Sequence, residues 1–374
     1  MADPAAQDAL WMRRALRLAR RGWGRTAPNP MVGAVLVRDG RLIGQGWHHG
    51  AGLPHAEIEA IQDARRRGER LRGATLYVTL EPCSTHGRTA PCTEAILAAG
   101  LRRVVVGAID PNPAHAGRGV AILRQAGVEV QTGVLAAEAA RLNEAFNHWI
   151  VHRTPFVTLK VAMSLDGRIA TRTGESKWLT GEAARRWAMR GRAGADAVLV
   201  GVNTVLADDP ALTVRGFAKP RPPWRVVLDS QARTPLNARL VTDDLAARTL
   251  VVVTRRAPTE RVRRLRERVQ VWQAPSRGGR VELGALLRHL GGLEVTHLWV
   301  EGGGQVHAAF LEAGLAHRLW AFYAPLILGG ESAPRAVAGK GLRFPDQAVR
   351  LSEVESRRLG PDLWVSGRLE APRG

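Results

Sequence analysis

Short apolar runs with the character of buried strands alternate with segments of helical spacing along almost the whole chain. In the first 150 residues the strand-like runs are 31–37, 41–47, 74–80, 102–110 and 128–133, and the helical patterns are 1–24, 55–68, 91–100 and 117–127. Asp39-Gly40 separates the first two runs and is a strong hairpin signal. Gly100 is a plausible helix C-cap. This alternation predicts an α/β domain in which helices cover a sheet.

A further helical pattern at 135–153 runs into Thr154-Pro155. Proline cannot continue a helix and biases the preceding residue toward extended backbone. We therefore predict a domain boundary here, with one domain over 1–152 and a second α/β domain over 153–374. The expected strands of the second domain are 157–164, 195–201, 224–230, 249–254, 269–272, 296–303 and 319–328.

Composition bears on location and partners. No apolar stretch is long enough to cross a membrane and no signal segment opens the chain, so we expect a cytoplasmic protein without a membrane partner. The net charge of +20 raises the question of nucleic acid. However, the arginines are spread along the chain, and in 260–271 they flank an apolar helical face of Val262, Leu265 and Val269. This pattern favours solvated helix faces and no nucleic-acid partner.

The only two cysteines, Cys83 and Cys92, lie in one loop between a strand and a helix. His55 precedes another helix. A catalytic zinc site takes three protein ligands from N and S donors and leaves one position for water. His55, Cys83 and Cys92 make such a set, and Glu57 stands two residues from the histidine. Zinc lowers the pKa of its bound water to about 7, and Glu57 could then move protons without binding the metal.

Other interpretations of the same residues exist. The two cysteines could form a disulfide, and an isolated His-x-Glu triplet has little meaning on its own. Against them stand four elements in the order of the zinc deaminase signature, H-x-E followed by P-C and a second cysteine, with the expected strand and helix around them. Cys92 begins a helix, where a thiolate is electrostatically favoured.

The long spacer between the two cysteines is the discriminating feature of this loop. PCSTHGRTAPC (82–92) resembles the cysteine loop of the bifunctional riboflavin-biosynthesis deaminase/reductase family, and APNPMVGAVLVRDG (27–40) resembles that family's upstream segment. Farther along, KVAMSLDGRIA, GESKWLTG, GADAVLVGVNTVLADDPALTVR and VEGGGQVHAAF resemble its reductase half. Ala90 departs from the family pattern, which usually has proline there. The resemblance covers nearly the whole chain in the same order.

The resemblance implies a cytidine-deaminase-like three-layer domain followed by a dihydrofolate-reductase-like domain. It implies two consecutive steps: zinc-dependent hydrolytic deamination of 2,5-diamino-6-ribosylamino-4(3H)-pyrimidinone 5′-phosphate, and NADPH-dependent reduction of the ribosyl to the ribityl side chain. The implied cofactors are one Zn²⁺ per chain and NADPH. The implied partners are the phosphorylated pyrimidine and further copies of the chain, as a dimer or tetramer.

Residue roles also follow from the resemblance. Asn29 and His48 would contact the pyrimidine, and Arg88 would bind its phosphate, although Asn29 could equally be a turn residue between two prolines. In the second domain the implied substrate contacts are Ser176, Arg192, Leu212, Arg215 and Glu301. The implied NADP contacts are Met163, Trp178, Thr204, Asp208, Ser230 and the loop 303–309, including Gly303 and Gly304.

The residues of the second domain say less by themselves. Gly302–Gly304 stand between a strand and a helix, which suits a phosphate cradle but is also an ordinary tight turn. Trp178 could equally belong to the core. Lys160, one of four lysines, could polarise the sugar oxygen. Two rival functions remain at this point: a tRNA or nucleobase editor, and a zinc-stabilised nucleic-acid-binding protein with four protein ligands.

Overall fold

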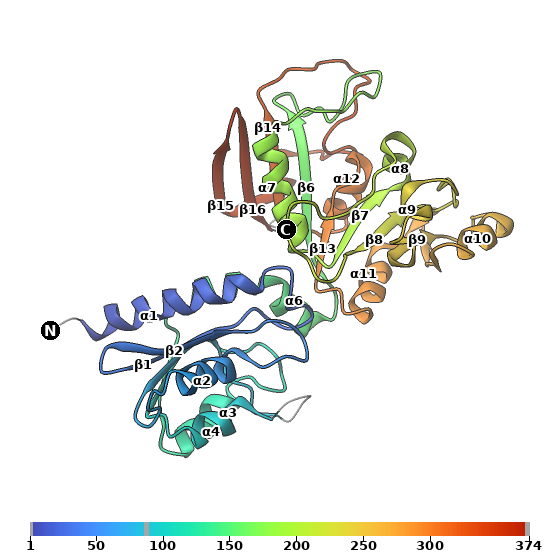
Figure 1. Ribbon diagram of the computed structural model, residues 1–374. Helices are drawn as coiled ribbons and strands as arrows, with labels where there is room; N and C mark the ends of the chain where they lie inside the picture. Colours follow the sequence, from blue (N-terminus) through green and yellow to red (C-terminus); the bar gives the residue numbers. More distant parts are fainter. Residues whose placement is uncertain (1–2, 86–89, 371–374) are drawn as a thin grey trace. The chain divides into compact units, whose positions relative to one another are not determined.

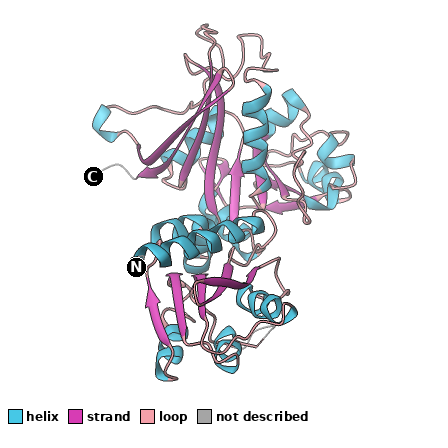
Figure 2. Cartoon of the chain, turned by 60° about the vertical axis from the view of Figure 1, so that its left-hand side comes forward, coloured by secondary structure: helices cyan, strands magenta, loops and turns pink. Residues whose placement is uncertain are grey.

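The computed structural model describes residues 3–85 and 90–370. It divides into two compact units, Met1–Arg153 and Thr154–Gly374. Each has its own sheet and its own core (Figures 1 and 2). None of the helices in the described ranges combines the length and apolar content that a membrane crossing requires.

The N-terminal unit is a five-stranded sheet between two layers of helices. Its strands are β1 (Gly33–Arg38), β2 (Arg41–Trp47), β3 (Thr75–Leu80), β4 (Arg103–Ala108) and β5 (Glu129–Thr132), in the order β2-β1-β3-β4-β5. Its helices are α1 (Pro4–Ala19), α2 (Ala56–Arg66), α3 (Cys92–Ala98), α4 (Arg118–Gln125), α5 (Ala136–Leu142) and α6 (Glu144–His152), with a 3₁₀ turn η1 (Arg20–Gly22). The β1–β2 hairpin at Asp39-Gly40 is confirmed.

Alternate residues of each strand pack against opposite helical layers, as the two-residue period of a strand requires. On one face Leu36, Leu76 and Val104 pack with α2, α3 and α4. On the other face Val35 and Val105 pack with α1 and α5. Figure 1 shows α1 on one side of this sheet and α2 to α4 on the other.

The helix expected over 135–153 is two helices rather than one. It breaks at Asn143 (φ −108°), between α5 and α6. The Asn143 side chain is buried and bonds the backbone of Met31, accepting from its N–H at 2.8 Å and donating to its carbonyl at 2.9 Å. A tertiary contact therefore ends the helix where the local pattern would continue it.

The C-terminal unit is built on a nine-stranded sheet of order β10-β9-β8-β7-β13-β6-β14-β16-β15. The strands are β6 (Phe156–Ser164), β7 (Ala197–Gly201), β8 (Trp224–Leu228), β9 (Thr249–Val253), β10 (Gln270–Gln273), β13 (His297–Val300), β14 (Arg318–Ala324), β15 (Arg350–Leu359) and β16 (Asp362–Glu370). From β10 to β14 all neighbours are parallel, and β16 and β15 add an antiparallel edge. A two-stranded ribbon joins β11 (Ser276–Arg277) to β12 (Arg280–Val281).

Helices cover both faces of this sheet. They are α7 (Glu182–Ala193), α8 (Val202–Asp208), α9 (Arg239–Thr242), α10 (Thr259–Arg266), α11 (Leu283–Gly292) and α12 (Gly304–Glu312), with 3₁₀ turns η2 (Ala246–Arg248) and η3 (Pro345–Gln347). Leu286, Leu290 and Phe310 pack on one face, and Val205 and Leu265 on the other.

Three expectations for this unit need correction. The strand expected over 319–328 ends at Ala324, and the helix at 260–271 ends at Arg266, so that Val269 packs from the following loop. The hairpin β15–β16 was not foreseen, because its outer strand is largely exposed and charged, with no clear alternation.

Candidate active sites

The metal-ligand cluster in the N-terminal unit joins two helix starts. Gly44 and Gly46 of β2 let the backbone of α2 approach closely, since a Cβ at Gly46 would lie 2.6 Å from the carbonyl oxygen of Ala56. His55 is the N-cap of α2. Cys83 follows β3, and Cys92 is the first residue of α3.

The three donor atoms lie within 4.8 Å of one another. The His55 Nδ1 is 3.2 Å from the Cys92 Sγ and 3.5 Å from the Cys83 Sγ. Zinc bonds of about 2.3 Å to sulfur and 2.1 Å to nitrogen, at tetrahedral angles, separate such donors by about 3.6 Å. The donor set and its spacing therefore fit a zinc ion. Both cysteines are free thiols, so the disulfide interpretation is wrong.

Hydrogen bonds connect the two cysteines and His55. The Cys92 backbone N–H donates to the Cys83 Sγ at 3.3 Å. Hydrogen bonds from Cys92 and His55 outweigh burial and lower the pKa of Cys83 to about 4. The backbone N–H at the start of α3 therefore contacts the Cys83 sulfur directly.

Glu57 is buried beside the cluster, with 3% of its surface exposed. Burial raises the pKa of Glu57 to about 7, although the nearby His55 lowers it. Its carboxyl group hydrogen-bonds Cys92. A carboxyl that titrates near neutrality next to a metal site is suited to moving protons.

His48 and Asn29 form a fixed pair at the same site. The Asn29 Nδ2 is 3.0 Å from the His48 Nε2, and the His48 Nδ1 is 3.0 Å from the Pro54 carbonyl oxygen. The Pro54 carbonyl can only accept, so the His48 Nδ1 carries a proton and donates to it. The Asn29 Nδ2 can only donate, so the His48 Nε2 accepts, and His48 is neutral. Burial lowers its pKa, in keeping with this form. The rings of His48 and His55 stand edge to face with centroids 5.3 Å apart. Arg88 lies outside the described residues.

Glu81 anchors the strand end that precedes Cys83. Its buried carboxylate accepts hydrogen bonds from the backbone N–H groups of Asp110, Gly117, Gly119 and Val120, at 3.2, 2.9, 2.9 and 3.4 Å. Three of these groups stand at the start of α4. The sequence does not mark Glu81 as functional, because an acid at a strand end has no motif of its own.

A second site is a cleft of about 1130 Å³ in the C-terminal unit. It lies at the carboxyl ends of parallel strands, the usual place for ligands in such sheets. The residues expected there line it except Met163, which lies in β6 outside the lining, and Ala308 of the segment 303–309. Those that line it are Ser176, Trp178, Arg192, Thr204, Asp208, Leu212, Arg215, Ser230, Glu301, Gly303 and Gly304. Trp178 is 68% exposed, so its assignment to the core is wrong.

The floor of the cleft holds a charged group. Arg192 donates to both carboxylate oxygens of Glu301, from Nε at 2.7 Å and Nη2 at 2.6 Å, and to the Thr213 carbonyl at 2.7 Å. Burial would raise the pKa of Glu301, but the charges of Arg192 and Lys160 lower it to about 2. Burial also lowers the pKa of Lys160. Arg192 therefore has only two N–H bonds left for a ligand.

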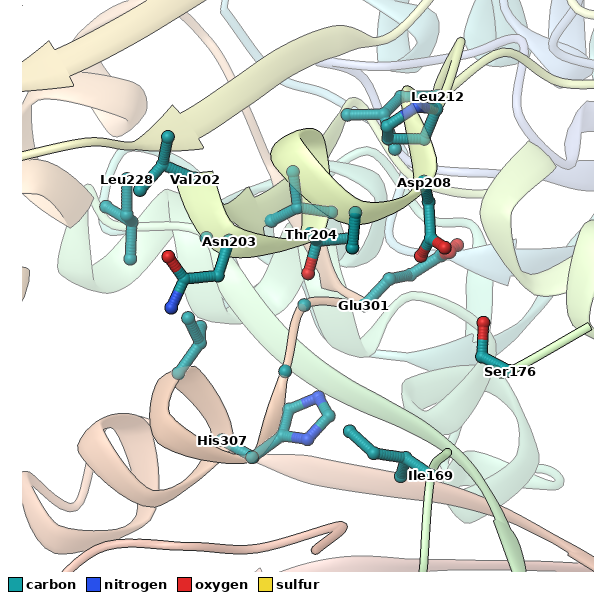
Figure 3. Close-up of a pocket in the computed structure, with 18 of the residues that line it drawn as sticks. Ile169, Ser176, Val202, Asn203, Thr204, Asp208, Leu212, Leu228, Glu301 and His307 are labelled. Atoms are coloured by element: carbon teal, nitrogen blue, oxygen red, sulfur yellow. The ribbon is translucent and has the colours of Figure 1, made fainter. Parts of the chain in front are cut away.

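The glycine loop follows β13 directly and leads into α12. A Cβ at Gly302 would lie 2.5 Å from the Val200 Cα, so only glycine fits against β7 here. The first turn of α12 then faces the cleft with Gly303 and Gly304. Backbone N–H groups at a helix start suit a phosphate. Figure 3 shows Thr204 of α8 above this loop and His307 of α12 below it.

Comparison with known proteins identifies both units. Residues 5–108 match the family model of the cytidine and deoxycytidylate deaminase zinc-binding region, and residues 155–365 match that of the RibD C-terminal domain. The riboflavin biosynthesis protein RibD of Actinobacillus pleuropneumoniae is 43% identical over 359 residues, with 96% of this chain and 94% of the relative covered. The chain belongs to the RibD family.

Solved RibD structures agree over the full length. Acinetobacter baumannii RibD, form 1, superposes with a TM-score of 0.86 at 38% identity, covering 98% of this chain and 99% of that one. A Thermotoga maritima diaminohydroxyphosphoribosylaminopyrimidine deaminase/5-amino-6-(5-phosphoribosylamino)uracil reductase superposes with a TM-score of 0.84 at 36% identity, covering 98% and 100%. As a RibD-family member the chain is a bifunctional deaminase and reductase of riboflavin biosynthesis, with a deaminase-like and a dihydrofolate-reductase-like domain. Membership of this family argues against the two rival functions, a tRNA or nucleobase editor and a zinc-stabilised nucleic-acid-binding protein.

Proposed function

We propose that the chain deaminates 2,5-diamino-6-ribosylamino-4(3H)-pyrimidinone 5′-phosphate in its N-terminal unit and then reduces the product's ribosyl group with NADPH in its C-terminal unit. The observation that carries the proposal is the presence, in one RibD-family chain, of a His-Cys-Cys cluster beside a buried glutamate and of a separate cleft lined by Arg192, Arg215 and the glycine loop.

In the deaminase site, His55, Cys83 and Cys92 would hold one zinc ion per chain. Zinc, when bound, supplies a Lewis acid that makes water a nucleophile at neutral pH. Glu57 takes a proton from water and gives it to the departing nitrogen, a role that its burial and near-neutral pKa support. A nearby cation favours the ionised carboxylate, which accepts the first of these protons.

Asn29 and His48 would orient the pyrimidine. Their mutual hydrogen bond fixes the amide, and no hydrogen bond among the described residues uses the Asn29 Oδ1. This oxygen is therefore available as an acceptor for an amino group of the ring. Arg88, in the cysteine loop, would bind the phosphate.

In the reductase cleft, hydride transfer requires the nicotinamide carbon to be held against the sugar carbonyl carbon without water. We assign Lys160, on β6 beside Glu301, to the sugar oxygen. Arg215 is exposed, has no ion pair among the described residues, and would meet the phosphate with the remaining donors of Arg192. Ser176 and Leu212 complete the substrate side. Trp178, Thr204, Asp208, Ser230, Gly303 and Gly304 remain the proposed NADP contacts, and Met163 is not retained because it does not line the cleft.

The cellular setting is also part of the proposal. We propose a cytoplasmic enzyme that forms a dimer or tetramer and binds no nucleic acid. The charge pattern supports the last point, because arginines such as Arg263 pair with acids of their own helix.

The decisive experiment adds the diaminopyrimidine ribosyl phosphate to zinc-loaded protein and follows NADPH absorbance and ammonia together. We expect both ammonia release and NADPH oxidation, because the reductase acts on the deaminated product. Ammonia without oxidation would refute the assignment of the cleft. Absence of both would refute the substrate or the zinc site.

A further inference from the structure

The cleft of the C-terminal unit has two chemically different ends. It follows the carboxyl ends of β6, β13, β7 and β8, which are neighbours in the sheet. Lys160 and Glu301 line it at β6 and β13. At the end of β8 it is lined by Leu228, Asp229, Ser230, Gln231 and Arg233, and Gly279, Arg280 and Val281 of the β11–β12 ribbon belong to the same wall. Figure 3 shows this direction along α8, from Asp208 and Glu301 at one end to Val202, Asn203 and Leu228 at the other.

The glycine loop divides these two ends. It follows β13, next to β7, and presents the start of α12 to the cleft. Because this is the part of the cleft best suited to a pyrophosphate, a dinucleotide whose nicotinamide lies by Lys160 would place its adenosine half beyond β7, at β8. Neighbouring strands are about 4.8 Å apart, so β6 and β8 are separated by about 14 Å.

At the β8 end of the cleft the arginines are exposed and the carboxylate is buried. Among the described residues that line this end, Asp229 is the one carboxylate. It is fully buried and turned inward, and its Oδ2 accepts from the N–H and the hydroxyl of Thr234, both at 2.7 Å. Arg233 donates from Nη2 to the Asn203 Oδ1 at 2.7 Å, which holds it at this end. Arg280 is exposed and has no ion pair in the described part of the chain.

We infer that Arg233 and Arg280 bind the 2′-phosphate of the adenosine ribose and thereby make the reductase select NADPH over NADH. Dinucleotide sites that take NAD present a carboxylate to the ribose 2′-hydroxyl, whereas those that take NADP place an arginine there. A guanidinium fork binds phosphate at two oxygens, and Asp229 is directed away from where it would repel one. The inference rests on the proposed reductase function and adds to it the residues that choose the cofactor.

Two adenosine fragments test the inference without turnover. Calorimetry compares 2′,5′-ADP with 5′-AMP on the full zinc-loaded chain and on Arg233→Gln, Arg280→Gln and Arg277→Gln. Arg277 is an exposed arginine of the same ribbon that does not line the cleft, so it is the matched control. We expect the unaltered chain to prefer 2′,5′-ADP by at least about tenfold. Each cleft variant should lose about tenfold in affinity for 2′,5′-ADP alone, and Arg277→Gln should lose none.

Turnover then separates this inference from the proposed function. With deaminated substrate, the ratio of kcat/KM for NADPH to that for NADH should fall in both cleft variants while the NADH value stays unchanged. An unchanged ratio, or an equal loss for both cofactors, would overturn the inference and leave the reductase function intact. If the unaltered chain bound neither fragment and oxidised neither cofactor, both would be overturned.

Discussion

The two sites of this chain are built on opposite principles. The deaminase site gathers His55, Glu57, Cys83 and Cys92 from fewer than forty consecutive residues, with its donors within 4.8 Å. The reductase cleft spreads over about 1130 Å³ and takes its residues from Lys160 to Pro334. Metal ligation needs a few exact distances, whereas binding a dinucleotide needs a long edge of a parallel sheet. The first kind of site can be recognised from the spacing of a few residues in the sequence. The second kind depends on the order of the strands in the sheet.

The substitution with the largest expected effect tests whether the deaminase site works independently of the reductase cleft. Cys83→Ala removes a zinc ligand and with it a Lewis acid worth several kcal/mol, so deamination should fall by at least about a thousandfold. Metal analysis should show zinc lost, while reduction of already deaminated substrate continues. Loss of both activities would show that the cluster also holds the reductase together.

Glu57→Gln tests the proton transfer separately from the metal. The amide keeps the size of the side chain but cannot accept the proton, so deamination should fall by about 10²- to 10⁴-fold. Zinc content should stay at the level of the unaltered chain. A variant that retains zinc and deaminates at full rate would exclude Glu57 from the mechanism.

We expect the ion pair of Arg192 and Glu301 at the floor of the cleft to stabilise the C-terminal unit as well as to bind substrate. Glu301→Ala leaves Arg192 and Lys160 without their partner in a mostly buried place, where breaking a pair costs about 3 kcal/mol. Urea unfolding followed by two probes, one in each unit, should show the loss in the C-terminal transition alone. Glu312→Ala, an exposed acid on α12, is the control, with a change below about 0.5 kcal/mol.

The stability of the N-terminal unit should depend on pH through the buried carboxylate of Asp8. Burial would raise the pKa of Asp8, but hydrogen bonds from Arg103 and Tyr77 lower it. The folded pKa is thus below the unfolded value of about 3.9, so the stabilisation is complete above that pH and is lost as pH falls through the folded pKa. Asp8→Asn should lower the free energy of unfolding by about 1–3 kcal/mol at pH 7. The difference from the unaltered chain should shrink in acid.

The smallest effect concerns the surface arginines. Arg263 pairs with Glu260 and Glu267 on α10, but all three side chains are more than half exposed. Arg263→Gln should therefore change the free energy of unfolding of the C-terminal unit by less than about 0.5 kcal/mol. A larger change in thermal or urea unfolding would mean that Arg263 contributes to stability beyond its exposed ion pairs.

The sequence predicted the three-layer unit well because its strands are apolar, short and paired with near neighbours. It predicted the zinc donors because their spacing is a local property. It did not predict the break at Asn143 or the partners of Glu81, since both depend on contacts with distant backbone. In the sequence nothing distinguishes Arg233 and Arg280 from the other arginines. Only the folded structure places both in the lining of the cleft. The residue type of Trp178 left a place in the core open, whereas the structure exposes this side chain and puts it in the lining of the cleft.

The position of β6 has a consequence for how the chain matures. The strands of the N-terminal sheet that pair are separated by short stretches of sequence, so this unit can fold as it leaves the ribosome. β6 opens the second unit, yet it pairs with β13 and β14, which are made some 130 to 160 residues later. At a synthesis rate of about 5–20 residues per second, the apolar side chains of β6 remain without these partners for on the order of ten seconds. The reductase is therefore the half of the nascent chain that most needs protection from aggregation, and the finished deaminase is already attached to it.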